Sequence, residues 1–432
     1  MPRFWNDQQG NIAVIFGIAL VPLVSAVGMA IDYSRAVSAR TAMQTALDSA
    51  ALMISRDAAS IDPSEIPARA QAYFKSLVNR PELANVTATA TYTASTGSGS
   101  RIEMTAKGNI STDFLKVIGF STLGLDVKST TVWGNTRIRV ALALDATGSM
   151  ASAGKMPAMK EAAKKLIDQL SANVKKPDDL YISMIPFSTH VNAGPSKYQQ
   201  SWLDWNDWEE VNGDCDKGSD KSRTKCTSKG GVWAPDQHST WNGCITDRDE
   251  DFDVKKTPPT TSNTSSLFQP EQYKPCPVEL VPLTYDWSKL KSSIDQITPG
   301  GPTNQPVGMA WAWLSLMPTL PLNAPPEDSN YTYKKIMIVL SDGLNTKNKK
   351  AGNGADHAIY VDGRQRLLCD NIKADKITVY TIQVNTDADP SSSILQYCAS
   401  GTDKFFMLTS PSQLMAAFDT IGASLTKLRI AK

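Results

Sequence analysis

The feature that most constrains the fold is an unbroken run of apolar residues at positions 140–144, which ends on Asp145. Such a run is typical of a strand buried on both faces, as in a parallel sheet. Thr147 and Ser149 follow at once, and apolar residues with helical spacing begin near Lys155. The pattern predicts an α/β domain with a carboxylate and two hydroxyls in a strand-to-helix loop. In open α/β sheets, ligands bind at that edge, beyond the carboxyl ends of the strands.

A second polar loop follows a second apolar run. Residues 336–340 lead into Ser341 and Asp342, and a tight loop at 300–304 precedes an apolar helix at 307–316. If the two strands are neighbours, five oxygen-bearing side chains converge at one edge of the sheet: Asp145, Thr147, Ser149, Thr303 and Asp342. Oxygen donors without His or Cys suit Mg²⁺, Mn²⁺ or Ca²⁺ rather than zinc.

The order of these residues resembles the metal-ion-dependent adhesion site of von Willebrand factor type A domains. The usual first motif of that family is Asp-x-Ser-x-Ser, and Thr147 keeps the hydroxyl at its middle position. The family's threonine often follows a Gly-Gly pair directly, whereas Pro302 precedes Thr303 here. The resemblance covers about residues 137–430. It implies a doubly wound, mostly parallel, Rossmann-like sheet.

The resemblance also implies how the metal is held and used. Ser149, Thr147 and Thr303 would bind Mg²⁺ directly, with Asp145 and Asp342 close by or acting through water. A coordination position left open would accept an Asp or Glu carboxylate from a partner protein. The implied function is metal-dependent protein binding without enzymatic activity.

Three other interpretations of the same residues compete. A Thr or Ser after a strand is often only a helix N-cap. A Mg²⁺-dependent phosphohydrolase or nucleotide-binding enzyme is the functional alternative, with Asp145 and Asp342 at its centre and Lys155 as the phosphate-binding residue. The glycines around Lys155 are spaced one residue too widely for a phosphate-binding loop, and Met156 stands where a Mg²⁺-binding hydroxyl is needed. An aspartyl phosphatase usually carries a second Asp where this chain has Thr147.

Residues 12–31 form twenty positions without a charge. At ~1.5 Å per residue, a helix of that length crosses a ~30 Å hydrocarbon core. We expect a retained transmembrane helix in contact with membrane lipid, preceded by a cytoplasmic segment at 1–11. A cleaved secretory signal is the alternative. Lys and Arg number 44 and Asp and Glu 43, so no charge bias points to nucleic acid as a partner.

The segment between the apolar run and the α/β domain reads as a small separate module. Residues 32–56 are Ala-rich with helical spacing, and strand-like stretches follow at 86–93, 101–106 and 125–132. These patterns predict a stalk helix and a small pilin-like α+β module over residues 32–133. The sequence from Gly10 to Ser34 resembles the N-terminal segment of Tad-type (TadE/TadG-like) proteins of Flp pilus assembly. That resemblance implies a part in assembling or anchoring pili.

A long insertion interrupts the α/β pattern at about residues 190–274. It contains five of the ten Trp residues: Trp202, Trp205, Trp208, Trp233 and Trp241. These could form a binding face that selects the partner or replace a missing core, and the sequence leaves both open. The alternating acids at 247–253 lack the Gly and Glu of a calcium loop, which favours a solvated acidic loop.

All six Cys lie from Cys215 onward. An even number confined to one region suits disulfides in an exported domain, so we expect the large C-terminal part to be periplasmic or extracellular. Four Cys in or beside the insertion allow three pairings. We expect a disulfide-stapled insertion with a Cys226–Cys244 bridge and a separate Cys369–Cys398 bridge.

Overall fold

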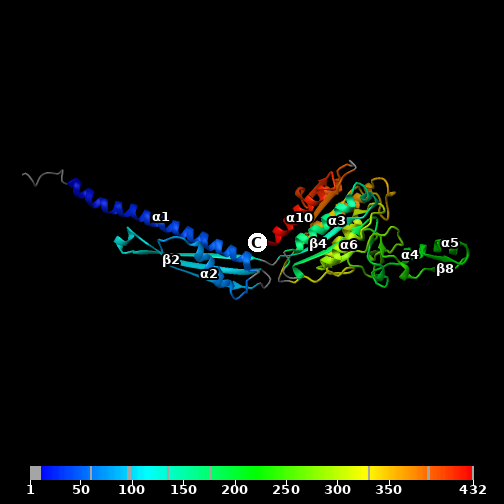
Figure 1. Ribbon diagram of the computed structural model, residues 1–432, viewed down its shortest axis with the longest axis horizontal. Helices are drawn as coiled ribbons and strands as arrows, with labels where there is room; N and C mark the ends of the chain where they lie inside the picture. Colours follow the sequence, from blue (N-terminus) through cyan, green and yellow to red (C-terminus); the bar gives the residue numbers. More distant parts are fainter. Residues whose placement is uncertain are drawn as a thin grey trace, which may run out of the picture. The chain divides into compact units, whose positions relative to one another are not determined.

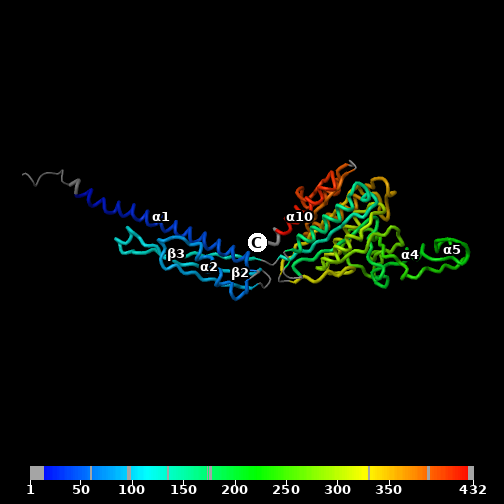
Figure 2. The backbone as a smooth tube through the Cα atoms, in the orientation of Figure 1, coloured from blue at the N-terminus to red at the C-terminus, as the bar shows by residue number. Residues whose placement is uncertain are grey.

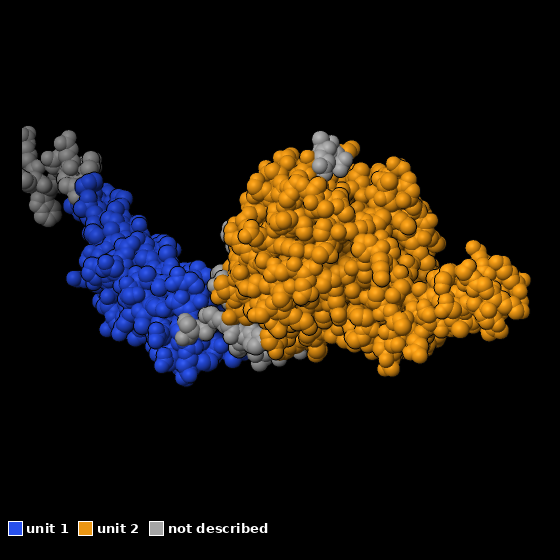
Figure 3. Space-filling view, turned by 45° about the vertical axis from the view of Figure 1, so that its right-hand side comes forward, with its two compact units in different colours: residues 1–135, 430–432 blue, residues 136–429 orange. Residues whose placement is uncertain are grey.

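The computed structural model describes residues 11–58, 61–94, 99–133, 136–172, 174, 177–328, 331–386 and 390–430. The chain divides into two compact units, residues 1–135 with 430–432 and residues 136–429 (Figure 3). Of the predicted cytoplasmic segment, residues 1–11, only Asn11 lies within the described residues.

The first unit combines two helices with a three-stranded antiparallel sheet in the order β1-β2-β3 (Figure 1). Its elements are α1 (Asn11–Asp57), α2 (Ile66–Leu77), β1 (Leu83–Thr93), β2 (Ser100–Ser111) and β3 (Thr122–Trp133). Each predicted strand is present and extends beyond the predicted limits. Alternation of Thr with Val, Ala and Tyr fits such a sheet, because one face packs and the other meets solvent.

Helix α1 changes character along its length. Between Val14 and Ile31 its side chains are exposed except at Gly28 and Ser25, and the helix is long and apolar enough to cross a membrane. From Ala36 onward one side of it is buried against the sheet and α2, through Ala39, Met43 and Leu47 among others. The apolar residues at spacings of three and four therefore form the core of this unit.

The second unit is built on one large sheet in the order β13-β12-β11-β4-β5-β6-β9, with β10 paired to β5. Strands β13, β12, β11, β4 and β5 are mutually parallel, and β6, β9 and β10 pair antiparallel. The strands are β4 (Thr136–Asp145), β5 (Leu180–Phe187), β6 (Val191–Asn192), β9 (Cys244–Ile245), β10 (Val281–Thr284), β11 (Thr332–Ser341), β12 (Thr378–Val384) and β13 (Phe405–Leu408).

Helices cover both faces of this sheet. The helices are α3 (Lys155–Ser171), α6 (Trp287–Asp295), α7 (Gln305–Ser315), α8 (Ile359–Ala374), α9 (Ser393–Cys398) and α10 (Gln413–Ile430). Val140, Leu142 and Leu144 pack with α3, α6 and α10, whereas Ala141 and Ala143 pack with α7, α8 and α9. Alternate residues of β4 thus serve two cores, as a strand buried on both faces must. The predicted doubly wound, mostly parallel sheet is confirmed.

The insertion leaves the sheet after β6 and forms short elements of its own, visible in the backbone trace of Figure 2. They are α4 (Asn206–Val211), β7 (Gly213–Cys215), α5 (Arg223–Ser228) and β8 (Trp233–Pro235). Trp202, Trp208 and Trp241 are at most 2% exposed and belong to the core on the α7 side of the sheet. Most of the insertion's aromatic surface is therefore packing rather than an exposed binding face.

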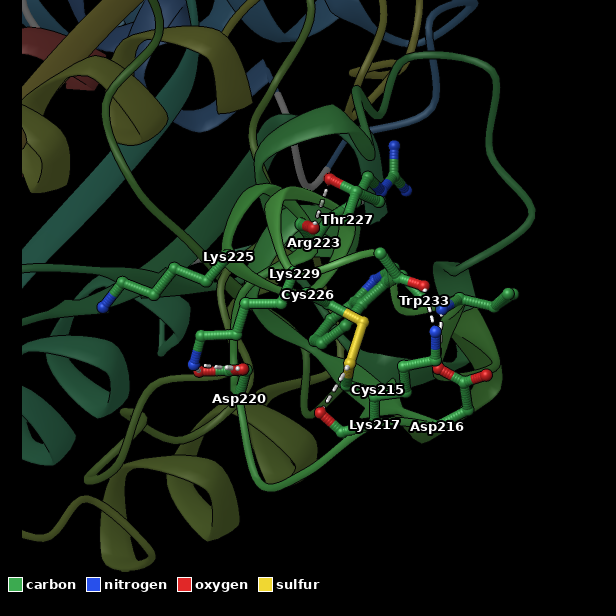
Figure 4. Close-up of a disulfide and its surroundings, with 12 residues drawn as sticks. Cys215, Asp216, Lys217, Asp220, Arg223, Lys225, Cys226, Thr227, Lys229 and Trp233 are labelled. Atoms are coloured by element: carbon green, nitrogen blue, oxygen red, sulfur yellow. Dashed lines mark hydrogen bonds and ion pairs between the residues drawn. A yellow bond between two sulfur atoms is a disulfide. The ribbon is translucent and has the colours of Figure 1, made fainter.

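Three disulfides link the six Cys: Cys215–Cys226, Cys244–Cys276 and Cys369–Cys398. The predicted Cys369–Cys398 bridge is confirmed, and the predicted Cys226–Cys244 bridge is wrong. Cys215 and Cys226 lie in neighbouring short elements, β7 and α5, which places their sulfur atoms together (Figure 4). Cys244 instead lies in β9, at the edge of the large sheet, and pairs with Cys276, just beyond the end of the insertion.

The acidic run of the insertion pairs with basic residues, while the side chains of Asp249 and Asp251 stay partly exposed to solvent as predicted. Arg364 of α8 forms ion pairs with Asp251 and Asp253, and Lys349 lies 3.6 Å from Asp249. Both basic residues follow β11, so these contacts fasten the insertion to the loop and helix that come after Asp342.

Candidate metal centre

Asp145 is the last residue of β4 and is fully buried. Its Oδ1 accepts a hydrogen bond from the backbone N–H of Thr147 at 2.8 Å, and its Oδ2 accepts one from the hydroxyl of Ser341 at 2.5 Å. Ala146 continues the pairing with the adjacent strand by donating its N–H to the carbonyl of Phe187. The strand end therefore fixes this carboxylate in place.

Asp342 reaches the same edge because β11 runs parallel to β4, with Leu340 opposite Leu144. Its Oδ1 accepts a hydrogen bond from Ser149 Oγ at 2.7 Å, and Ser149 Oγ lies 3.0 Å from Thr147 Oγ1. Asp145, Thr147, Ser149 and Asp342 thus form one chain of hydrogen bonds. Asp342 and Thr147 are buried, and Ser149 is exposed, which opens the cluster to solvent on one side.

Thr303 comes from the loop before α7 and is 5% exposed. Backbone hydrogen bonds tie its loop to the Asp145 loop, from Gly148 N–H to the Gly301 carbonyl at 2.9 Å and from Gly300 N–H to the Ala146 carbonyl at 2.8 Å. Gly301 has φ +84°, and a Cβ there would lie 2.9 Å from the hydroxyl of Tyr273. The position therefore favours glycine.

Lys155, the first residue of α3, was not predicted to contact an acidic side chain. Its Nζ lies 2.8 Å from Asp342 Oδ2, and both side chains are fully buried in this ion pair. The sequence offered Lys155 only as a phosphate-binding candidate. The position of Lys155, at the start of the helix that follows the Asp-x-Thr-x-Ser loop, could have suggested this contact. The burial of the Lys155 side chain is seen only in the structure.

Two buried carboxylates lie at the site beside one buried ammonium group. Burial, together with the negative charge of Asp342, raises the pKa of Asp145 to about 7. A carboxylate in that setting is stabilised by a nearby cation. The donors are hard oxygens in two acids and neighbouring hydroxyls, so the residues fit a divalent cation of the Mg²⁺, Mn²⁺ or Ca²⁺ type.

The insertion supports the Thr303 loop from behind, which the sequence did not predict. Asp247 is buried, and its Oδ2 accepts hydrogen bonds from Asn304 Nδ2 at 2.8 Å and from Lys349 N–H at 3.1 Å. Burial raises its pKa to about 6. Asn304 is also the N-cap of α7, so one buried acid of the insertion fixes the residue next to Thr303.

A second group of residues with metal-binding side chains gives no site. Cys215, Asp216 and Cys226 lie close together, but the two sulfur atoms are joined to each other (Figure 4). A disulfide sulfur is not the thiolate that binds a metal ion.

The fold and the cluster define a class of protein: an α/β domain with an oxygen-rich site at the carboxyl edge of its sheet, preceded by an apolar helix. At the level of family, residues 10–54 match the proteins described as "Putative Flp pilus-assembly TadE/G-like". The match covers most of α1, including the whole apolar segment. The search of curated proteins gave no match.

Several solved structures are similar to this chain. They include the vWF domain of a type V pilus tip protein from Porphyromonas gingivalis, at 10% identity and TM-score 0.38 over 68% of this chain and 97% of that one. The pilus adhesin SpaC of Lactobacillus rhamnosus GG matches at 10% identity and TM-score 0.38 over 80% and 34%. The mussel byssus proximal thread matrix protein 1 with a zinc-occupied MIDAS motif matches at 12% identity and TM-score 0.35 over 67% and 48%.

This chain therefore spans about half of the mussel protein and about a third of the Lactobacillus adhesin. The comparisons name the same two groups of proteins that the sequence motifs resemble, pilus-assembly and type A domain proteins.

Proposed function

We propose that this chain is a membrane-anchored, non-enzymatic binding protein whose α/β domain holds a divalent cation, Mg²⁺ or alternatively Mn²⁺ or Ca²⁺. Ser149, Thr147 and Thr303 bind the ion directly in this proposal, and Asp145 and Asp342 lie close by or act through water. The observation that carries it is the hydrogen-bonded chain from Asp145 through Thr147 and Ser149 to Asp342. A bound cation would supply a position that accepts an Asp or Glu carboxylate of a protein partner.

The proposed biological role is assembly or anchoring of Flp/Tad-type pili, with adhesion as the outcome. It is supported by the match of residues 10–54 to a pilus-assembly family and by the apolar helix that this segment forms. The partner would be a pilus or secretion-assembly component that presents a carboxylate. Nucleic acid is not among the proposed partners.

We propose a topology with residues 1–11 in the cytoplasm, 12–31 in the cell membrane, a pilin-like module at 32–133, and a type A domain at 137–430 that carries the insertion at 190–274. The large C-terminal part lies in the periplasm or outside the cell. The three disulfides support that side, because such bonds persist in oxidising compartments.

The contact of Lys155 disfavours the enzymatic alternative. A phosphohydrolase or nucleotide-binding enzyme based on Asp145 and Asp342 needs a lysine that reaches phosphate. Lys155, the candidate in the sequence, is buried and points its ammonium group at Asp342.

The test compares cells that carry Asp145→Ala with cells that carry Ser152→Ala, an exposed hydroxyl in the same loop. We expect Asp145→Ala to remove pili or adhesion while Ser152→Ala leaves both unchanged. Normal pili and adhesion in Asp145→Ala cells would refute the proposed role. Robust phosphatase or NTPase turnover by the purified protein with Mg²⁺, lost in Asp145→Asn, would establish the enzymatic alternative instead.

A further inference from the structure

The turn between β2 and β3 exposes four large apolar side chains on a short stretch of chain. It contains the 3-10 helix η3 (Leu115–Ile118). The exposed fractions are 40% for Phe114, 81% for Val117, 52% for Ile118 and 60% for Phe120. A contiguous apolar surface of this kind marks a site of contact with another molecule or with a membrane.

The backbone of this turn is held by its own hydrogen bonds. Thr112 donates its N–H to the carbonyl of Ser121 at 3.1 Å and its hydroxyl to the carbonyl of Phe120. Gly119, with φ +98°, closes η3 by donating its N–H to the carbonyls of Leu115 and Lys116. The apolar side chains are therefore presented by a defined backbone rather than by a loop that could fold them inward.

Asp32 of α1 holds the turn at a fixed position along the helix. Its carboxylate accepts hydrogen bonds from the backbone N–H groups of Asp113 at 3.1 Å and of Phe114 and Leu115 at 2.8 Å each. Arg35, one turn further along α1, forms an ion pair with Asp113. Asp32 is the first charged residue after the apolar segment, so the turn is fixed where that segment ends.

The side chain of Phe114 extends from the position of Asp32 toward the apolar segment of α1. Its ring lies against Gly28, where an added Cβ would come within 2.5 Å of it. Four residues of helix separate Gly28 from Asp32, which corresponds to about 6 Å along the helix axis. The two elements line a shallow apolar pocket formed by Leu23, Val24, Val27, Gly28, Ile31 and Phe114.

We propose that this turn, residues 113–120, is a second membrane contact: Phe114, Val117, Ile118 and Phe120 enter the interfacial region of the leaflet where α1 leaves the bilayer. The inference rests on the proposed membrane anchor and adds to it. The occupant of the apolar surface is lipid, because the surface is continuous with the apolar segment of α1 and fixed at its end. The distance of about 6 Å along α1 that Phe114 spans falls within the depth reached by interfacial amphipathic segments.

The polar residues of the turn fit the same placement. Lys116 is exposed between the apolar side chains, where its ammonium group can reach lipid phosphates while its stem lies along apolar surface. The Arg35–Asp113 ion pair lies on the Asp32 side, at the level expected for headgroups. The contact would restrain the tilt and rotation of the first unit at the membrane.

The experiment places an environment-sensitive fluorophore on single introduced thiols in the full chain, reconstituted in phosphatidylcholine and phosphatidylglycerol vesicles. The six native Cys are all in disulfides, so they do not compete for the label. Val117→Cys reports on the turn and Val21→Cys on the apolar segment. Val132→Cys is the matched control, an exposed valine at the opposite end of the same sheet. Quenching by spin-labelled lipids then measures contact with the bilayer.

We expect the Val117 label to shift to the blue and to be quenched most strongly by lipids labelled near the headgroup, with no quenching of the Val132 label. A Val117 label that behaves like the Val132 label overturns the inference. A blue shift at Val117 without lipid quenching also overturns it, because protein would then cover the turn. The Val21 label decides the anchor separately: absence of quenching there refutes the transmembrane helix, whatever the turn does.

Discussion

The ammonium group of Lys155 lies 2.8 Å from Oδ2 of Asp342, and both side chains are fully buried. One carboxylate oxygen of Asp342 is therefore paired with a positive charge. The other oxygen accepts a hydrogen bond from the hydroxyl of Ser149. Lys155 is the counter-ion of Asp342, one of the two buried acids. The other acid, Asp145, has a raised pKa. In the proposed site, a divalent cation balances the charge of these acids.

Replacing Lys155 tests the importance of that pair. Lys155→Met should destabilise the metal-free protein by ~3–5 kcal/mol, because it leaves a buried carboxylate without its counter-ion. Added Mg²⁺ should recover part of this loss. Lys165→Met is the control, since Lys165 lies in the same helix and forms an exposed pair with Asp419 that is worth about 0–1 kcal/mol. Chemical denaturation measures both variants, and equal losses in the two would contradict a special role for Lys155.

Removing a proposed ligand should abolish stabilisation by metal. A ligand that binds only the folded state at about 100 times its Kd stabilises it by roughly 2.7 kcal/mol. We expect Mg²⁺ to raise the melting temperature of the unmodified protein and of Ser152→Ala, but not that of Asp145→Ala or Ser149→Ala. Thermal unfolding in EDTA and in excess Mg²⁺ provides the comparison. A full Mg²⁺ effect in both ligand variants would show that the ion binds elsewhere.

The raised pKa of Asp145 predicts a pH dependence. Because the folded state holds this proton more tightly than the unfolded state, its contribution to stability is fully present below the ordinary pKa of 3.8. That contribution is lost as pH rises toward the folded value of about 7. Mg²⁺ competes with the proton, so the shift in melting temperature caused by Mg²⁺ should grow over the same range.

Asp145→Asn provides the comparison for this pH effect, since its side chain does not titrate. Metal-free unfolding curves across that range should show a decline in stability for the unmodified protein that is smaller in Asp145→Asn. Superimposable pH profiles would mean that Asp145 is ionised throughout, contrary to the burial that the structure gives it.

The disulfides provide a prediction about compartment and stability. Protein taken from its native compartment should show no reaction with thiol reagents under denaturing conditions until it is reduced. Replacing Cys244 and Cys276 together by Ser should cost about 3–4 kcal/mol, because that bridge closes a loop with a sequence separation of 32. Free thiols in the native protein, measured by mass spectrometry after alkylation, would place the domain in a reducing compartment.

The parts of the fold that sequence alone predicted are those set by local pattern. An unbroken apolar run ended on Asp145 as the structure has it, and the second such run, at 336–340, lies in β11. The parallel pairing of β4 and β11 brings Asp145 and Asp342 to one edge of the sheet. From the sequence alone, it had to be assumed that these two strands are neighbours. Each of these inferences needed only the period of a strand and the direction of its neighbours.

What the sequence did not predict depends on partners distant in the chain. Cys226 bonds to Cys215 rather than Cys244, and that choice follows from the short elements around it. A lysine is usually exposed, so nothing local predicted that Lys155 is buried against Asp342. The insertion has few aliphatic residues, yet Trp202 and Trp241 complete a core supplied mostly by the sheet and by helices α7, α8 and α9.

The most direct test of the account is the anomalous scattering of Mn²⁺ in crystals of this protein. Mn²⁺ can replace Mg²⁺ at an oxygen-ligand site and is visible where Mg²⁺ is not distinguished from water. We expect one strong anomalous peak among the side chains of Thr147, Ser149 and Thr303, with Asp145 and Asp342 beside it. A protein that binds Mn²⁺ only elsewhere, or shows no peak at saturating Mn²⁺ while Lys155 remains on Asp342, would contradict it.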